Sequence, residues 1–151
     1  MNRQKGQGLV EFAIILPILL LVIIASLFFG MMFADYLALN SMANRAAREA
    51  SLVTKEDYIS GGYNYEKVRA KFAGQTMPAG MYKWNYKSDN DFKIFYEKSN
   101  QAVVVEMTAV IDSNAAFYPA VAGVLKDSAL EKLTVTYRMF SEEALPDKPS
   151  S

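Results

Sequence analysis

An uninterrupted apolar run over residues 12–34 constrains this chain more than any other feature of its sequence. The run comprises about 23 residues and contains no charged side chain. A helix rises about 1.5 Å per residue, so this run would measure about 34 Å, slightly more than the ~30 Å hydrocarbon core of a bilayer. We therefore predict an N-terminal helix that can cross a membrane.

Two ordinary interpretations of this segment have to be weighed. In a cleaved secretory signal, Arg3 and Lys5 would form the basic region. However, the apolar run exceeds the ~7–15 residues of a signal core, and no small-x-small cleavage site follows it before Tyr36. In an uncleaved membrane anchor, Glu11 would be a charge at the head-group boundary and Gly6 a flexible spacer. Hydropathy alone permits this second interpretation.

The residues ahead of the apolar run have a spacing that favours a third interpretation. Cleavage after Gly6 would leave Gln7 as a new N-terminus and Glu11 as the fifth residue of the mature chain, directly before the aromatic Phe12. A glycine before this bond has no side chain to obstruct a protease. Gly8 offers a rival bond, but cleavage there would make Glu11 the third residue. We therefore favour cleavage after Gly6.

This arrangement resembles the class III signal of type IV pilins, and more closely that of the Tad or Flp subgroup. Residues 6–17, followed by a leucine-rich stretch, are similar to TadE-like minor pilins, also called pseudopilins, and the similarity continues through residues 44–50. It covers about a third of the chain. The resemblance implies cleavage by a membrane prepilin peptidase, and partners among other pilins and minor pilins, the pilus assembly platform and the lipid bilayer.

The same resemblance implies a location. The chain would be a single-pass protein of the inner, cytoplasmic membrane, with a cytoplasmic N-terminus and an extracytoplasmic C-terminal domain. Incorporation into a surface pilus stays open. Arg3 and Lys5 favour a cytoplasmic leader, although Arg45 and Arg48 on the far side weaken the charge bias.

Glu11, Phe12 and Pro17 are the residues that we predict to act in assembly. At the membrane boundary the Glu11 carboxylate costs little, but in a filament of packed helices it would be buried, where an unpaired charge is expensive. The α-amine made by cleavage, with an ordinary pKa near 7.7–8.0, is a suitable cation on the same or a neighbouring subunit. Pro17 removes a backbone donor and favours a kink or local unwinding, which can be structural or functional.

Small residues recur at every fourth position of the predicted helix. Residues four apart lie on one face, so these form a ridge that another helix can approach closely. Outside the membrane, alanine can equally be present as a good helix former. The predicted packing residues are Ser26, Gly30, Ala34 and Ala38, and after Met42 the series resumes with Ala46 and Ala50.

Beyond the membrane the helix is predicted to continue from Asp35 to about Leu52, with the Ala46 and Ala47 face packed on a small domain. Two prolines and mixed charges indicate a flexible tail at the C-terminus. The predicted divisions are a leader (1–6), a membrane and assembly helix (7–34), a helix extension (35–54), a small domain (55–140) and a tail (141–151).

The small domain combines one helical pattern with several alternating ones. A short helix is predicted over residues 65–73, and a loop or weak helix over residues 114–125. Apolar residues alternate with polar ones in four segments separated by short polar turns, which indicates an antiparallel sheet of about four strands and an α+β fold. The aromatic row of the first segment is interpreted as core rather than as an adhesive surface. The segments are residues 82–86, 92–96, 103–111 and 133–139.

Composition excludes several kinds of function. The chain has no histidine and no cysteine, which removes imidazole bases, thiol nucleophiles and the usual zinc ligands. Its 16 basic and 16 acidic residues balance, without a basic cluster for nucleic acid. We predict no enzyme activity, no metal and no cofactor. The predicted function is that of a minor pilin; the alternatives are an uncleaved, anchored binding or adhesion domain and, more remotely, a secreted soluble domain.

Overall fold

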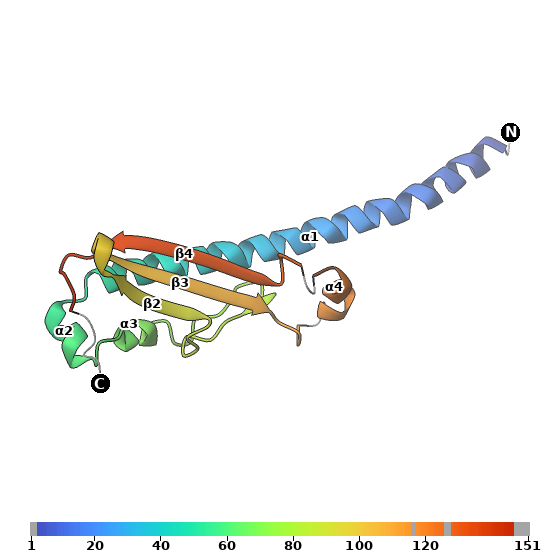
Figure 1. Cartoon of the computed structure of the whole chain (residues 1–151). Coiled ribbons are helices and arrows are strands. Elements are labelled where there is room, and N and C mark those ends of the chain that lie inside the picture. The colour runs from blue at the N-terminus through green and yellow to red at the C-terminus, as the bar shows by residue number, and fades with distance from the viewer. Residues whose placement is uncertain (1–2, 116, 126–127, 147–151) are drawn as a thin grey trace.

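A single helix of 49 residues, α1 (Arg3–Ser51), dominates the structure. The computed structural model describes residues 3–115, 117–125 and 128–146. The C-terminal half of α1 lies along a small domain, while the N-terminal half projects away from it (Figure 1). Pro17 lies inside α1, and the helix continues through it. The predicted membrane segment and its extension are therefore one continuous helix, as expected.

Two short helices follow α1. The predicted helix over residues 65–73 is shorter in the structure, because after Ala70 the backbone closes i→i+3 bonds that tighten the last turn as far as Ala73. Gly74 then ends the turn with a φ of 84°, a left-handed conformation that glycine adopts without strain. Val68 and Phe72, four residues apart, are both buried and form the apolar face of this segment. The two helices are α2 (Lys55–Ser60) and α3 (Glu66–Ala70).

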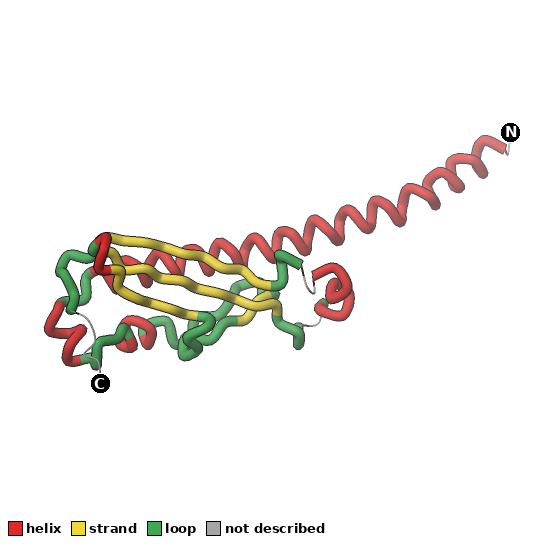
Figure 2. The backbone as a smooth tube through the Cα atoms, viewed as in Figure 1, coloured by secondary structure: helices red, strands yellow, loops and turns green. Residues whose placement is uncertain are grey.

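Four strands form an antiparallel sheet, which confirms the predicted α+β fold. The long β3 is central: β4 pairs along one edge of it, while β2 and then β1 pair along the other (Figure 2). A short 3₁₀ turn, η1, joins β2 to β3, and a fourth helix, α4, joins β3 to β4. The elements are β1 (Tyr82–Lys83), β2 (Phe92–Glu97), η1 (Lys98–Asn100), β3 (Ala102–Ile111), α4 (Tyr118–Leu125) and β4 (Lys132–Phe140).

The core lies between α1 and one face of this sheet. On β3 the predicted inward side chains are buried, and Val103, Val105 and Met107 are fully so. Alanines supply the facing surface of α1; Ala46 and Ala47 are fully buried there, as predicted. Small side chains allow the helix axis to come close to the sheet, so the packing of α1 follows from this alanine-rich face.

The first strand is much shorter than the predicted segment of residues 82–86. Only Tyr82 and Lys83 pair with β3, opposite Ile111 and Val110. The next position on that edge of β3 is already taken, because the Thr108 N–H donates to the Asp91 carbonyl ahead of β2. The aromatic row nevertheless belongs to the core: Tyr82 is buried, and Trp84 and Tyr86 pack against the core while half-buried.

The C-terminal segment differs from the flexible tail predicted from residue 141. Ser141 and Leu145 are buried, and the Ser141 N–H donates to the Gln101 carbonyl at 2.9 Å. The Glu143 carboxylate accepts a hydrogen bond from the backbone N–H of Lys55 at 2.7 Å, so this segment also covers the start of α2. Burial of Leu145 and these backbone bonds outweigh the turn-forming composition; residues 147–151 lie outside the described residues.

Candidate functional site: the N-terminal helix and its junction with the domain

The N-terminal half of α1 presents apolar side chains on every face. The most apolar window of the helix is entirely unburied within the chain, and large side chains such as Leu21 are 67% exposed. Within the described residues, one helix is long and apolar enough to cross a membrane. A helix that is apolar all round needs an apolar environment, so α1 is consistent with a single membrane span.

The predicted cleavage and assembly residues lie at the start of this exposed half. Gly6 and Gln7 belong to the first turns of α1, although the side chain of Gln7 is outside the described part of the structure. Glu11 and Phe12 are exposed, with Phe12 61% accessible. The helix places Glu11 one turn, about 6 Å along the axis, from Gln7. An amine created at Gln7 would therefore arise close to the Glu11 carboxylate of the same chain.

The predicted ridge of small residues divides into two parts. Ser26 and Gly30 are exposed, and a Cβ placed on Gly30 would meet nothing within 4 Å. The Ser26 hydroxyl donates to the Val22 carbonyl of its own helix at 2.8 Å, so its polar group is already satisfied. Ala34 and Ala38 are half-buried, and Ala38 packs against the core of its own domain. The chain itself therefore leaves open the Ser26 and Gly30 part of the ridge.

The junction between α1 and the domain depends on Asp35, which sequence reasoning treated only as the first residue beyond the membrane. Its side chain is fully buried. The carboxylate accepts three backbone hydrogen bonds, from the N–H groups of Ala79 (2.7 Å), Met81 (2.8 Å) and Tyr82 (3.1 Å). These three donors satisfy the hydrogen-bonding capacity of a buried carboxylate. No signal in the sequence connects Asp35 to a loop more than forty residues away.

Tyr82 extends this junction to the segment that precedes β4. Its hydroxyl donates to the Leu130 carbonyl at 2.6 Å. Burial of the ring, and secondarily the negative charge of Asp35, raise the pKa of Tyr82 above its ordinary value, so the hydroxyl keeps its proton and remains a donor. Asp35 and Tyr82 together connect α1, the loop before β1 and the entry to β4.

Further polar contacts hold the C-terminal part of α1, beyond Asp35, on the domain. The Tyr137 hydroxyl of β4 donates to the Asn40 side-chain oxygen at 3.1 Å. Asn40 is half-buried on the side of α1 that meets the domain. Glu49 forms an ion pair with Lys71 beyond α3. The contacts of Asp35 and Glu49 thus hold the interface between α1 and the domain at its two ends, and they fix the orientation of the domain on the helix.

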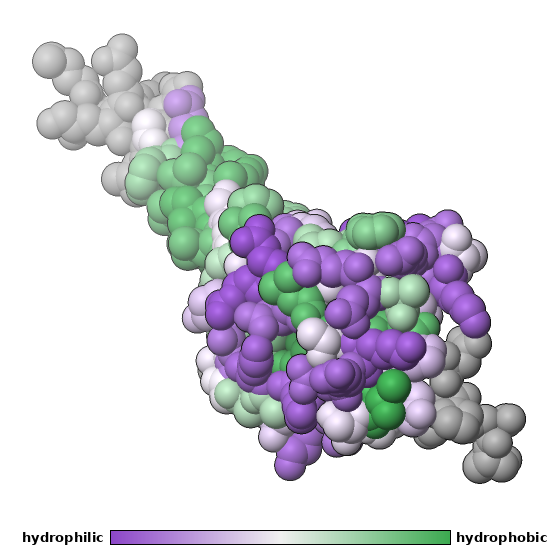
Figure 3. All heavy atoms as spheres, turned by 90° about the vertical axis from the view of Figure 1, so that its left-hand side faces the viewer, coloured by the Kyte–Doolittle hydropathy of each residue, from purple (hydrophilic) through white to green (hydrophobic). Residues whose placement is uncertain are grey.

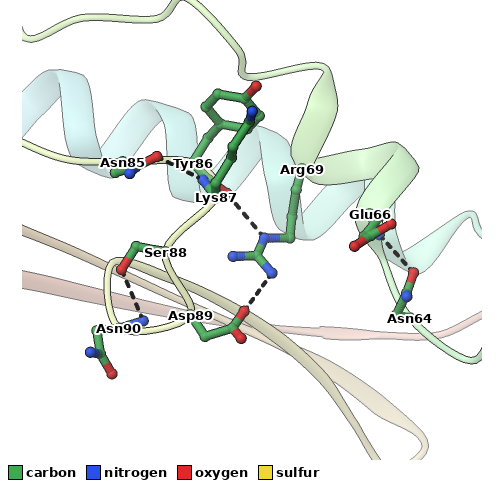
Figure 4. A network of polar contacts seen from close by, with 9 residues as sticks. All are labelled: Asn64, Glu66, Arg69, Asn85, Tyr86, Lys87, Ser88, Asp89 and Asn90. Carbon is green, nitrogen blue, oxygen red and sulfur yellow. Dashed lines mark hydrogen bonds and ion pairs between the residues drawn. The ribbon is translucent and has the colours of Figure 1, made fainter.

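A second polar cluster lies between α3 and the loop that connects β1 to β2. Arg69 points from α3 toward this loop, where its Nε donates to the Tyr86 carbonyl at 3.1 Å and its guanidinium pairs with Asp89 at 2.6 Å (Figure 4). The guanidinium also lies 5.8 Å from the centre of the Phe92 ring. An open hollow of about 390 Å³ lies beside it, lined by Glu66, Arg69, Ala70, Tyr86 and Lys87. These contacts explain the position of Arg69, which holds the loop between β1 and β2 against α3.

The fold and the exposed helix define a class of protein in which a small α+β domain is seated on one long N-terminal helix with an apolar, uncovered half. Residues 6–48 match the family model of TadE-like proteins, and the matched segment lies wholly within α1. Over this segment the chain is similar to TadE-like proteins, a family linked to Tad pilus systems. No curated protein and no solved structure matches the chain.

Proposed function

We propose that this chain is a minor pilin, or pseudopilin, which takes part in the assembly of a Tad-type pilus after cleavage following Gly6. The observation that carries the proposal is the coincidence of the TadE-like segment with α1, whose apolar half the chain's own domain leaves uncovered. Such a helix can reside in a bilayer before assembly and pack on neighbouring helices afterwards. The proposed function is therefore pilus assembly by packing of α1 on the helices of neighbouring subunits.

The residues at the start of α1 supply the charges that the move from the bilayer into a helix bundle requires. In lipid, Glu11 lies at the boundary of the apolar run, where a carboxylate remains close to water. In a bundle of apolar helices the same carboxylate becomes buried and requires a cation. Cleavage after Gly6 creates an amine one turn away or, on an adjacent copy, at a similar level. Processing would therefore prepare the chain for assembly by supplying the charge that complements Glu11.

The mature protein is expected to begin at Gln7. That bond makes Glu11 the fifth residue, and Gly6 leaves the peptide accessible to a protease. Replacing Gly6 by a bulky residue such as leucine should leave the uncleaved precursor to accumulate, while Gly8→Ala should be processed normally. Intact-mass analysis of the membrane fraction measures both results. Retention of Met1 in the wild-type protein would contradict the proposal and favour an uncleaved anchor.

The domain is expected to lie on the extracytoplasmic side of the membrane. The prepilin peptidase interpretation requires the leader on the cytoplasmic side, and α1 then carries the domain across. Protease added to intact spheroplasts should digest the domain, and the same protease should spare it in inverted membrane vesicles. Digestion only in the inverted vesicles would place the domain in the cytoplasm and would overturn the proposed orientation.

An anchored binding or adhesion domain is the competing function. In that case Gly6 would remain uncleaved and Glu11 would be replaceable. The processing experiment therefore separates the two functions before any ligand is sought.

A further inference from the structure

The helix α4 is an apolar element at the end of the domain that faces the N-terminal half of α1 (Figure 1). Residues 115–125, which include α4, contain no charged side chain. Phe117, just ahead of α4, and Val121 within it pack against the core. Pro119 and Gly123, four residues apart and thus on one face, are exposed. The structure thus leaves an uncharged face of α4 uncovered.

This element meets α1 within the apolar run. The rings of Phe117 and Phe28 make an edge-to-face contact with centroids 5.7 Å apart. Phe28 precedes Asp35 by seven residues, about 10 Å along the helix. The domain therefore reaches back along α1 into the apolar run.

An apolar groove adjoins the same level of α1. Its volume is about 380 Å³, and its walls come from α1, from the segment before β4 and from the start of β4. Phe29 and Phe33 are 64% and 60% exposed, and Leu130 is 37% exposed. The lining residues are Phe29, Met32, Phe33, Tyr36, Leu130 and Leu133. The groove and the exposed face of α4 lie at the same end of the domain, continuous with the uncovered half of α1.

The length of the apolar run decides where the membrane boundary falls. A span of ~30 Å needs about 20 residues, which from Phe12 reaches Met31. If the hydrocarbon ended below α4, at Leu27, the span would contain only about 16 residues and measure about 24 Å, which is too short. Phe28 is therefore inside the hydrocarbon region, about 5 Å below Met31. Any tilt of α1 lengthens the required run and places α4 deeper.

Polarity along the domain agrees with this placement. The opposite end of the domain faces the viewer in Figure 3 and is largely hydrophilic, with the apolar helix receding behind it. At the α4 end, Asp112 closes β3 and pairs with Lys83 at 3.2 Å. The backbone N–H of Asn114, together with Lys83, holds the pKa of Asp112 below its usual range, so this carboxylate stays charged. A charged carboxylate is expected in the head-group layer rather than in the hydrocarbon, which limits how deeply the end of the domain can enter.

We propose that the exposed face of α4 and the adjoining groove, defined by Pro119, Gly123, Phe29, Phe33 and Leu130, bind the acyl-chain boundary of the bilayer, so that the domain is seated in the membrane surface. This inference rests on the membrane span of the proposed function. Interfacial helices enter the head-group and acyl boundary by about 5–10 Å, which matches the level of Phe28. The surface would hold the domain at one height and limit the tilt of α1 before assembly.

The test uses the full chain, which has no native cysteine, reconstituted at low density in phosphatidylcholine and phosphatidylglycerol vesicles that contain brominated lipid. Gly123→Cys carries an environment-sensitive fluorophore; a Cβ there would meet nothing within 4 Å. Gly30→Cys is the matched control inside the span, and Ser99→Cys, exposed in η1, is the aqueous control. Pro119→Cys repeats the measurement on the same face, in case a label at residue 123 disturbs α4.

The expected result is that labels at residues 119 and 123 are quenched by brominated lipid several-fold more than the label at Ser99, and that aqueous iodide quenches them little, as at Gly30. Iodide quenching equal to that at Ser99, with Gly30 still in lipid, would overturn the inference and leave the membrane span intact. Protection that appears only when other pilins are added would assign the surface to a neighbouring subunit instead. Exposure of Gly30 to iodide would contradict the membrane span itself.

Discussion

Replacing Asp35 by alanine is expected to lower the free energy of unfolding of the domain by about 3–5 kcal/mol. The substitution leaves the N–H groups of Ala79, Met81 and Tyr82 without their acceptor in a buried place. A buried donor that loses its partner costs about 1–3 kcal/mol, and a cavity is left where the carboxylate was. Against a total stability of about 5–15 kcal/mol for a domain, this loss is severe.

Asp35→Asn tests the same contact with almost no change of shape. The amide retains one acceptor oxygen but directs an NH₂ group at a backbone N–H, so we expect a loss smaller than for alanine but still above about 1 kcal/mol. Glu49→Gln is the control, because it neutralises a carboxylate of the same helix whose ion pair with Lys71 is at the surface. Exposed pairs contribute about 0–1 kcal/mol.

Chemical unfolding of the detergent-solubilised protein, followed by pulse proteolysis of the domain, measures these differences. Hydrogen exchange adds a local measurement, since the amides of Met81 and Tyr82 should lose their protection in both Asp35 variants and keep it in Glu49→Gln. If Asp35→Ala unfolds at the same denaturant concentration as Glu49→Gln, the three hydrogen bonds do not hold the junction together.

Replacing Glu11 is expected to leave membrane insertion and cleavage intact and to deplete the assembled complex more than tenfold. Neutralising a carboxylate at the membrane boundary makes residence in lipid no harder. In the assembled state, however, Glu11→Ala leaves the amine buried without its partner, a defect that costs about 3–5 kcal/mol at other buried pairs. Even half of that exceeds the roughly 1.4 kcal/mol that corresponds to a tenfold change in an association constant.

The experiment expresses each variant with its native secretion partners and compares cleavage, membrane content and co-purified pilins. Glu11→Gln keeps the shape without the charge and should resemble Glu11→Ala, whereas Glu11→Asp should retain part of the assembly. Glu49→Gln serves again as the control for loss of a carboxylate on α1. Normal assembly of both neutral variants would make Glu11 a boundary charge only and would favour the anchored binding domain.

The periodicity of the sequence was enough for the elements whose apolar pattern is long. The run over residues 12–34 and the alternation in β3 and β4 predicted one long helix and the central strands, because local spacing alone decides which side of such an element is apolar. Ala46 and Ala47 likewise predicted the face of α1 that meets the sheet. The spacing of Gly6, Glu11 and Phe12 predicted the resemblance to TadE-like proteins, which the family-model match over residues 6–48 confirms for that segment.

Elements that depend on distant partners could not be read from the sequence. The strand predicted over residues 82–86 stops at Lys83 because the Asp91 carbonyl already binds the next position on β3. The segment after residue 140 has the composition of a tail, yet it is held by Leu145, which finds a buried place on the domain. In each case a competing contact from elsewhere in the chain outweighs the local preference.

The sequence by itself determined that this chain has an apolar helix long enough for a bilayer, with one carboxylate at its start and a small α+β domain after it. Tertiary structure alone decided how the two parts meet. Asp35 looked like a boundary charge and is instead buried under three backbone donors. Residues 114–125 were predicted as a loop or weak helix, with no indication that Phe117, just ahead of α4, lies against Phe28 inside the apolar run. Both contacts join residues more than forty positions apart, where no periodicity connects them and only the packing of the whole domain on α1 brings them together.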